Sequence, residues 1–122
     1  MTTENKQNIL RAIDWLIDHF PQTFFKKSLD IKPLQIGIYK EIVTFYDRLE
    51  TPPFSKKLLK DALNYYSASR PYLLCQKANA ARIDLYGNEV DSVTEDQAKY
   101  AHQRFEQRYN TPKKASDISS NN

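Results

Sequence analysis

The sequence predicts a mainly α-helical domain with one small β-hairpin, of the α+β class. Most apolar residues recur at the three- and four-residue spacing of a helix face. Alternation of polar and apolar residues is confined to one short stretch, residues 82–90, which contains a Gly-Asn turn signal. The length of 122 residues suits one compact domain. We therefore expect a single domain over residues 1–109 and a disordered polar tail over residues 110–122.

The first predicted helix has one apolar face and ends at a proline. Its apolar residues follow the spacing of a single helical stripe: Ile9, Ala12, Ile13, Leu16, Ile17 and Phe20. Pro21 ends this helix because the residue before a proline is pushed out of the α-helical conformation. Residues 21–35 form a connector with one short apolar insert. A second helix follows at about residues 36–49, and the Pro-Pro pair at 52–53 terminates it.

The third and fourth predicted helices carry the basic residues of the centre of the chain. Ser55 is a good N-cap for the third helix, because its hydroxyl can accept a hydrogen bond from a first-turn amide. The apolar residues of this helix face the core: Leu59, Ala62, Leu63 and Tyr66. Its polar residues point elsewhere: Lys56, Lys57, Lys60 and Asn64. Ser69 caps a short fourth helix, whose first turn tolerates Pro71 because a missing amide costs little there.

A hairpin and a last helix complete the predicted order. Residues 82–85 alternate polar and apolar, the Gly-Asn pair at 87–88 supplies a turn, and a short strand returns. Thr94 and Gln97 form a capping box at the start of the last helix. The inner stripe of that helix consists of Ala98, Ala101, Phe105 and Tyr109.

Positive charge is concentrated in one segment. Residues 1–50 are neutral, residues 51–82 carry a net charge of +5, and residues 83–122 carry −2. The positive segment also contains three aromatic residues, Tyr65, Tyr66 and Tyr72. Localised positive charge interleaved with aromatic rings fits a polyanion with stackable groups, that is, a nucleic acid. A solvated basic helix face explains the charge alone equally well.

Several classes of protein are excluded. The chain has two glycines, Gly37 and Gly87, whereas a glycine-rich phosphate loop needs at least two close together. No apolar run is long enough to span a membrane. The chain also does not open with the charged and apolar segments of a secretory signal. We therefore expect a cytoplasmic protein with no membrane partner.

Residues that perform catalysis or bind metals are too sparse to form a site. Cys75, His19 and His102 are far apart and lack the spacing of metal ligands. Cys75 is expected to be a small buried apolar residue rather than a nucleophile. Asp14 and Asp18 lie four residues apart on the outer face of the first helix, as in a solvated face. We expect no metal, no cofactor and no enzymatic activity.

The start of the short fourth helix is a candidate phosphate site. Unpaired amides and the positive end of the helix dipole attract phosphate groups to helix N-termini. Ser69 and Arg70 lie at this start, and Tyr72 follows within the first turn. In the structural alternative, Ser69 merely caps the helix and Tyr72 lies at the edge of the core.

Three separated motifs stand out: Lys32-Pro33-Leu34-Gln35-Ile36-Gly37-Ile38-Tyr39, the segment from Leu59 through Leu73, and Ala80-Ala81-Arg82-Ile83-Asp84-Leu85-Tyr86-Gly87-Asn88. In this order and spacing they resemble the ProQ/FinO family of bacterial RNA chaperones. The resemblance covers about residues 7–109. It implies a compact helical ProQ/FinO-like domain with a small hairpin and a concave basic face.

The resemblance also implies roles for single residues. Tyr72 and Arg82 match the tyrosine and the arginine of the family's pocket for an RNA 3′ end, and Ser69 matches the hydroxyl residue at the start of the pocket helix. Lys56 and Lys60 match basic positions on the RNA-facing helix. The predicted RNA-binding residues are therefore Lys56, Lys57, Lys60, Ser69, Arg70, Tyr72 and Arg82.

The chain also departs from the family's pattern. Gln35, Asn64 and Pro71 stand where some relatives carry basic residues, and Arg70 is expected to supply charge in place of Pro71. The family's long basic C-terminal extension is absent, so we expect a minimal, single-domain member.

The expected function is that of an RNA-binding protein and RNA chaperone. By resemblance, it recognises the base of a terminator hairpin and the U-rich 3′ end, and acts as a monomer in post-transcriptional regulation. Its expected partners are small regulatory RNAs and mRNA 3′ ends with terminator hairpins. Two other classes stay open: a protein–protein adaptor whose basic helix docks an acidic partner, and a duplex-DNA binder.

Overall fold

The computed structural model describes residues 2–110 and confirms a mainly helical fold with one small hairpin. In chain order the elements are α1 (Thr3–His19), the 3-10 helix η1 (Ser28–Asp30), α2 (Ile38–Tyr46), α3 (Lys56–Ser67), α4 (Arg70–Cys75), β1 (Ala81–Ile83), β2 (Glu89–Ser92), α5 (Glu95–Phe105) and the π-helical turn η2 (Glu106–Asn110). Every predicted helix and the predicted hairpin are present. The expected tail falls, apart from Asn110, outside the described residues.

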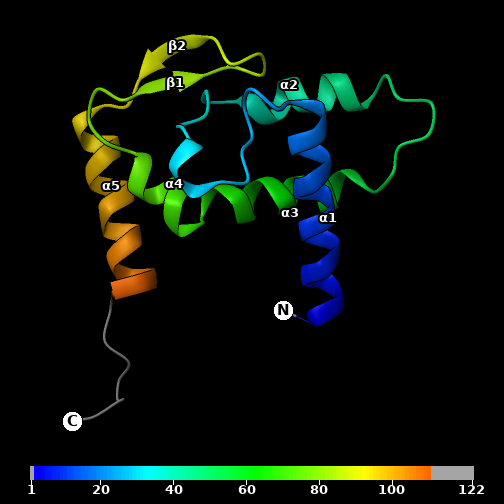
Figure 1. The fold of residues 1–122 in the computed structure, drawn as a ribbon, viewed down its shortest axis with the longest axis horizontal. Coiled ribbons are helices and arrows are strands. Elements are labelled where there is room, and N and C mark those ends of the chain that lie inside the picture. The colour runs from blue at the N-terminus through cyan, green and yellow to red at the C-terminus, as the bar shows by residue number, and fades with distance from the viewer. Residues whose placement is uncertain (1, 111–122) are drawn as a thin grey trace.

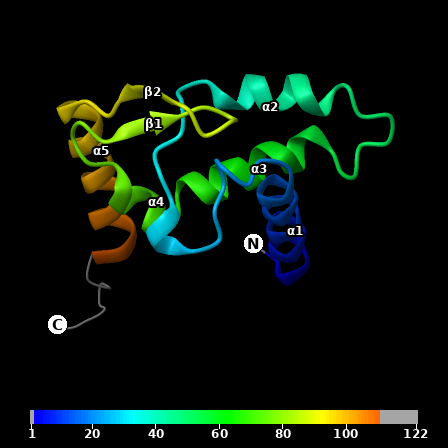
Figure 2. The ribbon, with the colours of Figure 1, turned by 45° about the horizontal axis from the view of Figure 1, so that its top comes forward.

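Helix α3 runs through the middle of the molecule (Figure 1). Helix α1 packs against α3 near one end, while α4 and α5 pack together at the other. The turned view shows the hairpin and α2 along the same side of α3 (Figure 2). The short α4 and strand β1, which carry Tyr72 and Arg82, therefore lie at the α5 end of the molecule.

The core is formed where the apolar faces of α1 and α3 meet the connector between α1 and α2. The predicted stripes supply its buried members on α1 and α3: Ile9, Ala12, Leu16, Phe20, Leu59, Ala62, Leu63 and Tyr66. The connector is part of this core, because Thr23 and Phe24 are both fully buried. The Thr23 hydroxyl donates a hydrogen bond to the carbonyl oxygen of Asp84 (2.9 Å), which ties the connector to the hairpin.

The end of the connector pairs with β1, which the sequence did not predict. Leu34 forms a parallel bridge with Ile83. The Ile83 amide donates to the Pro33 carbonyl (3.0 Å), and the Gln35 amide donates to the Ile83 carbonyl (2.8 Å). Residues 33–35 therefore lie along β1 on the side away from β2.

The hairpin is short and irregular. Ala81 pairs with Ser92 and Ile83 with Glu89, with an irregularity in register between the two pairs. Gly87 adopts a left-handed conformation (φ +82°) in the connecting turn, as the Gly-Asn signal predicted. Ile83 of β1 is buried and anchors the hairpin to the core, whereas every residue of β2 is exposed.

The starts of α3 and α5 have their predicted side-chain caps. The Ser55 hydroxyl accepts a hydrogen bond from the Leu58 amide (3.1 Å). Thr94 and Gln97 form both bonds of the capping box, at 3.0 and 3.1 Å. Gly37 is left-handed (φ +83°), so α2 begins only at residue 38.

Two details of the predicted helices were wrong, the end of the second helix and the burial of Tyr109. Helix α2 ends at Tyr46 rather than Leu49. Tyr109 is 39% exposed rather than part of a buried stripe, although its hydroxyl donates to the Ala68 carbonyl (2.9 Å). The π-helical turn after Phe105 changes the helical spacing, so Tyr109 no longer follows the inner face of α5.

None of the helices in the described part of the chain is both long and apolar enough to cross a membrane. Within residues 2–110, no group of three or more His, Cys, Asp or Glu side chains could hold a metal ion. Asp14 and Asp18 are both exposed, as expected of a solvated face.

Candidate nucleic-acid interface

A cavity of about 350 Å³ opens where α4, β1 and α5 meet the end of α3. We call it the α4–α5 cavity. It contains two of the predicted site residues, Tyr72 and Arg82. Its other lining residues are Ser67, Leu73, Gln76, Asp96, Gln97, Tyr100, Ala101 and Arg104.

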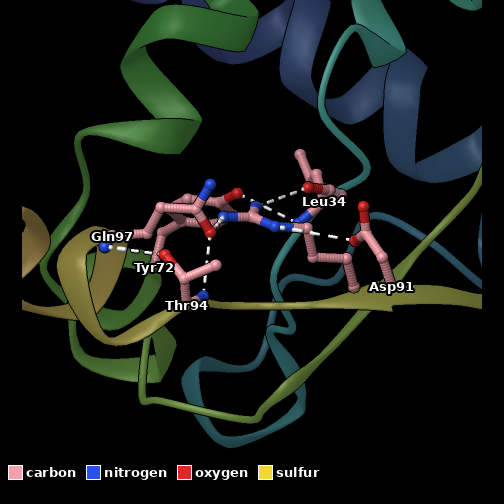
Figure 3. A network of polar contacts seen from close by, with 6 residues as sticks. Leu34, Tyr72, Asp91, Thr94 and Gln97 are labelled. Atoms are coloured by element: carbon pink, nitrogen blue, oxygen red, sulfur yellow. Dashed lines mark hydrogen bonds and ion pairs between the residues drawn. The ribbon is translucent and has the colours of Figure 1, made fainter.

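Arg82 is buried in the wall of this cavity, with 7% of its surface exposed. Its Nη1 donates to the Leu34 carbonyl (2.8 Å) and its Nη2 donates to Gln97 Oε1 (3.1 Å). Its Nε lies 3.8 Å from Asp91 Oδ1, which adds an ion pair with an exposed carboxylate. Figure 3 shows this network around Leu34, Asp91 and Gln97. The guanidinium is therefore held rigidly by the fold, and the alternating pattern of the strand did not predict its burial.

Tyr72 is equally buried, with 8% of its surface exposed. Its hydroxyl accepts a hydrogen bond from the Leu34 amide (3.0 Å). Burial raises the pKa of this hydroxyl, although the Leu34 hydrogen bond and the Arg82 charge oppose the rise. Tyr72 therefore stays protonated at neutral pH, and its position is set by the same backbone residue that Arg82 contacts.

Cys75 lies on the same helix as Tyr72 and is partly buried. Its thiol donates to the Tyr72 carbonyl (3.1 Å). Burial raises the pKa of the thiol to about 11. Because the thiolate is the nucleophilic form, this environment fits the expected unreactive cysteine.

Helix α5 contributes lining residues that the sequence did not single out. Tyr100 and Arg104 lie one turn apart, with the Arg104 guanidinium 5.9 Å from the centre of the Tyr100 ring. Asp96 lines the same cavity and is exposed. Their spacing in the sequence could have identified these lining residues, because Gln97, Tyr100 and Arg104 flank Ala101, a buried residue of the predicted inner stripe.

The lysines of α3 form a face that leads toward the cavity. Lys56, Lys60 and Ser67 lie at positions i, i+4 and i+11, which share one side of a helix. Ser67 lines the α4–α5 cavity, and Lys56 lies about 16 Å away along the helix axis. The structure therefore places the predicted lysines on an approach to the cavity rather than inside it.

Two of the three lysines are paired with carboxylates. Lys56 Nζ lies 2.7 Å from Asp47 Oδ1, and this hydrogen bond raises the pKa of Lys56. Lys57 Nζ lies 3.1 Å from Asp61 Oδ2. Lys60 has no ion pair among the described residues and is exposed. The positive charge of the segment is thus partly compensated by Asp61, which its net charge already includes, and by Asp47, which lies outside the segment.

The structure separates Ser69 and Arg70 from the other site residues. Ser69 holds the N-cap position of α4, as predicted, but its hydroxyl donates backward to the Tyr66 carbonyl (2.7 Å) and does not cap an amide. Ser69 lines a different, mostly apolar cavity of about 220 Å³ beside α1. Arg70 is exposed, and its guanidinium lies 5.7 Å from the centre of the Phe105 ring.

The model of the ProQ/FINO family matches residues 6–117 of this chain. The chain belongs to the ProQ/FinO family. The resemblance drawn from the three motifs is therefore confirmed. Among curated relatives, the RNA chaperone ProQ of Aeromonas salmonicida is 34% identical over 106 residues, which cover 86% of this chain and 49% of that protein. The RNA chaperone ProQ of Haemophilus ducreyi is 37% identical over 103 residues, covering 83% and 55%.

Solved structures of ProQ/FinO proteins resemble this fold. The solution structure of a ProQ homolog from Legionella pneumophila matches with a TM-score of 0.75 and 55% identity, covering 93% of this chain and 88% of that one. NMB1681 of Neisseria meningitidis, a FinO-like RNA chaperone, shares the fold with a TM-score of 0.62 at 19% identity, covering 89% and 83%. The chain spans about half the length of the curated ProQ/FinO relatives it matches. Their names are those of RNA chaperones and not of enzymes, in agreement with the expected lack of enzymatic activity.

Proposed function

We propose that this chain is an RNA chaperone domain that holds the base of a terminator-type hairpin and the U-rich 3′ end that follows it. The proposal rests on one observation above the others. The helix face that carries Lys56 and Lys60 leads to a cavity that contains tyrosine and arginine side chains. The curated ProQ/FinO relatives are named RNA chaperones, which favours RNA as the polyanion that binds here.

The stem is assigned to the α3 face. An A-form stem displays its phosphates and 2′-hydroxyls rather than its base edges, so it is recognised by shape and charge. Lys60 is exposed for a phosphate contact, and Lys56 is available if it exchanges Asp47 for phosphate. Lys57 lies beside this face, and Arg70 lies near Phe105 at the C-terminal end of α5. Each would add positive charge around the RNA.

The 3′ end is assigned to the α4–α5 cavity. Arg104 and the wall formed by Arg82 offer positive charge to the last phosphates, and the exposed Tyr100 ring offers a surface for stacking, next to a wall that contains the largely buried Tyr72 ring. Asp96 would accept hydrogen bonds from the hydroxyls of a terminal ribose, as acidic residues do for ribose in dinucleotide sites. The same carboxylate would repel a terminal phosphate. Ser69, which lines a different cavity, would act only indirectly, by holding the start of α4 through its hydrogen bond to the Tyr66 carbonyl.

The proposal is tested by titrating the protein with four versions of one hairpin at fixed salt. These carry the intact U-rich tail, a trimmed tail, a 3′-phosphate, or the same sequence as DNA. We expect trimming and phosphorylation each to weaken binding about tenfold, equivalent to about 1.4 kcal/mol. Equal affinity for the intact and the trimmed hairpin would contradict the cavity assignment. Equal affinity for RNA and DNA would favour the duplex-DNA alternative.

The proposal also includes the cellular compartment, the oligomeric state and the RNA partners of the domain. We place the domain in the cytoplasm, acting as a monomer on small regulatory RNAs and on mRNA 3′ ends. Sedimentation of the complex would give one protein per hairpin, whereas a two-to-one complex would contradict the monomer.

A further inference from the structure

A second hollow lies between α2 and the loop that joins β1 to β2. It has a volume of about 400 Å³, and Figures 1 and 2 both show the hairpin loop reaching toward α2. Its lining residues are Lys40, Glu41, Thr44, Phe45, Arg48, Leu85 and Tyr86. A smaller hollow of about 190 Å³ shares Phe45, Leu85 and Tyr86 with it. We call the two together the α2–hairpin site.

Tyr86 stands between the two hollows with 69% of its surface exposed. Its backbone is fixed, because the amides of Tyr86 and Asn88 both donate to Asp84 Oδ1, at 2.8 and 3.0 Å. Next to it, Gly87 packs so closely on Gln22 that an added Cβ would lie 3.0 Å from its carbonyl oxygen. A large aromatic ring is therefore displayed to solvent from a rigid turn rather than from a loose loop.

Two cationic side chains lie beside this ring. Lys40 lies on α2 and Arg48 lies in the turn just after its end, and both line the larger hollow together with Tyr86. Both are exposed, and neither forms an ion pair within residues 2–110. Glu41 is the one acidic residue among those lining the site, so the lining carries a net positive charge.

The α2–hairpin site is separate from the α3 face. Tyr39 of α2 and Asp47, directly after α2, contact Lys56 of α3 through a hydrogen bond of 3.4 Å and the ion pair of 2.7 Å. Of the residues that line the site, Glu41 and Phe45 lie on a different side of α2, whereas Lys40, seven residues before Asp47, lies at the edge nearest the α3 face. An RNA stem on the α3 face therefore leaves the α2–hairpin site open to a different segment of RNA.

An exposed tyrosine that shares a hollow with two cations free of ion pairs has the chemistry of a single-strand binding site. Bases that are not paired can stack on an aromatic ring, while Lys and Arg bind the phosphates on either side. A base-paired stem cannot offer such a base. We propose that the α2–hairpin site binds unpaired nucleotides of the same RNA, outside the stem and the 3′ end. This inference rests on the proposed function, since it takes RNA to be the ligand.

The test compares two hairpins with identical stems and U-rich tails, one of which carries an unpaired 5′ leader. We expect the wild-type protein to bind the hairpin with the leader more tightly. We expect the affinity for that RNA to fall about tenfold in Tyr86→Ala. We expect a similar fall in the double variant Lys40→Ala/Arg48→Ala. Neither should change the affinity for the hairpin without the leader. The double variant should also flatten the salt dependence for the first RNA alone.

A matched control removes two charges elsewhere. Lys6→Ala/Arg11→Ala, on the exposed face of α1, should leave both affinities within about twofold of wild type. Because all these side chains are exposed, unchanged thermal unfolding is expected for every variant. Leader RNA containing 4-thiouridine should crosslink to residues 84–88, and crosslinks confined to other segments would overturn the inference.

The outcomes also separate this inference from the proposed function. If the site variants weaken both RNAs equally, the site belongs to stem or end binding and the inference is wrong. If they weaken neither, the ligand of this site is not RNA, and an acidic protein segment becomes the alternative. If Arg104→Ala leaves both RNAs unaffected while Tyr86→Ala weakens binding of the leader RNA, the inference stands and the 3′-end assignment fails.

Discussion

Tyr72 and Arg82 bind the two backbone polar groups of the same residue, Leu34. The Tyr72 hydroxyl accepts from the Leu34 amide (3.0 Å), and Arg82 Nη1 donates to the Leu34 carbonyl (2.8 Å). Both side chains also line the α4–α5 cavity. They therefore hold the connector against α4 and β1 while they form part of the candidate RNA site. Variants at either position will change stability and binding together, so the two effects must be measured separately.

The variant Tyr72→Phe separates these effects for the tyrosine. It keeps the ring in the cavity wall but leaves the buried Leu34 amide without a partner, so we expect a loss of about 1–3 kcal/mol in the free energy of unfolding. RNA affinity should change less than about threefold, because the ring stays in the cavity wall and the hydroxyl is bonded to the Leu34 amide. Urea unfolding and RNA titration of the same preparation test this. A tenfold loss of affinity with unchanged stability would show that the hydroxyl contacts RNA directly.

Arg104 is a site residue whose loss should affect RNA binding but not stability. It lines the cavity and lies over the Tyr100 ring, but no hydrogen bond holds it among the described residues. Arg104→Ala should therefore weaken RNA binding about tenfold with little change in melting temperature. Arg82→Ala, its matched comparison, should lower both, because it leaves the Leu34 carbonyl without a donor and removes one of the two hydrogen bonds to Gln97 Oε1. Normal RNA affinity of Arg104→Ala would remove α5 from the proposed site.

The sequence predicted those parts of the structure that depend on near neighbours. The Ser55 cap, the capping box of Thr94 and Gln97 and the turn at Gly87 each need only three or four consecutive residues, and all three are confirmed. The stripes of α1 and α3 are equally local, because each helix buries one face.

The remaining features depend on residues far apart in the chain. Arg82 is buried because Leu34, 48 residues away, accepts its hydrogen bond. Lys56 is paired because the turn after α2 brings Asp47 to it. Local spacing contains neither fact. The sequence placed Tyr72 beside a candidate phosphate site, but it identified Tyr72 and Arg82 as one pocket only through family resemblance, and it missed Tyr100 and Arg104 of α5.

The ion pair between Lys56 and Asp47 predicts an unusual gain of affinity. Asp47→Asn frees Lys56 and removes a negative charge from the approach to the α3 face, so RNA binding should tighten roughly twofold to fivefold at low salt. Asp61→Asn is the matched control, since it frees Lys57, which lies off the stripe of Lys56 and Lys60. The gain should be larger for Asp47→Asn and should vanish at high salt. A loss of affinity in Asp47→Asn would mean that the pair positions Lys56 for RNA.

Cys75 predicts a specific pH dependence. Its pKa is raised from 9.0 to about 11, so at pH 8 the folded protein should react with a thiol reagent roughly a hundredfold more slowly than the unfolded chain. A group with a raised pKa stabilises the fold below its unfolded pKa, and this contribution is lost as pH rises from about 9 to 11. Cys75→Ala should therefore flatten the decline in stability over that range. Rapid labelling of the folded protein at pH 8 would contradict the buried thiol.

Gly87 and Gly37 provide a matched pair for testing the rigid turn that displays Tyr86. Both are left-handed, with φ of +82° and +83°. An added Cβ at Gly87 would lie 3.0 Å from both Gln22 Cβ and the Gln22 carbonyl oxygen, whereas one at Gly37 would meet nothing within 4 Å. Each alanine variant should lose about 1–2 kcal/mol of stability to backbone strain. Gly87→Ala should lose more, because the backbone of Gln22 must also move.

The same pair tests whether the turn matters for RNA. If Tyr86 must be displayed from a fixed turn, Gly87→Ala should weaken binding of the hairpin with a 5′ leader and leave the hairpin without a leader unaffected. Gly37→Ala should change neither affinity by more than about twofold, since strain without collision need not displace the hairpin loop. Equal unfolding free energies and equal leader affinities for the two variants would show that the contact with Gln22 does not hold the turn in place.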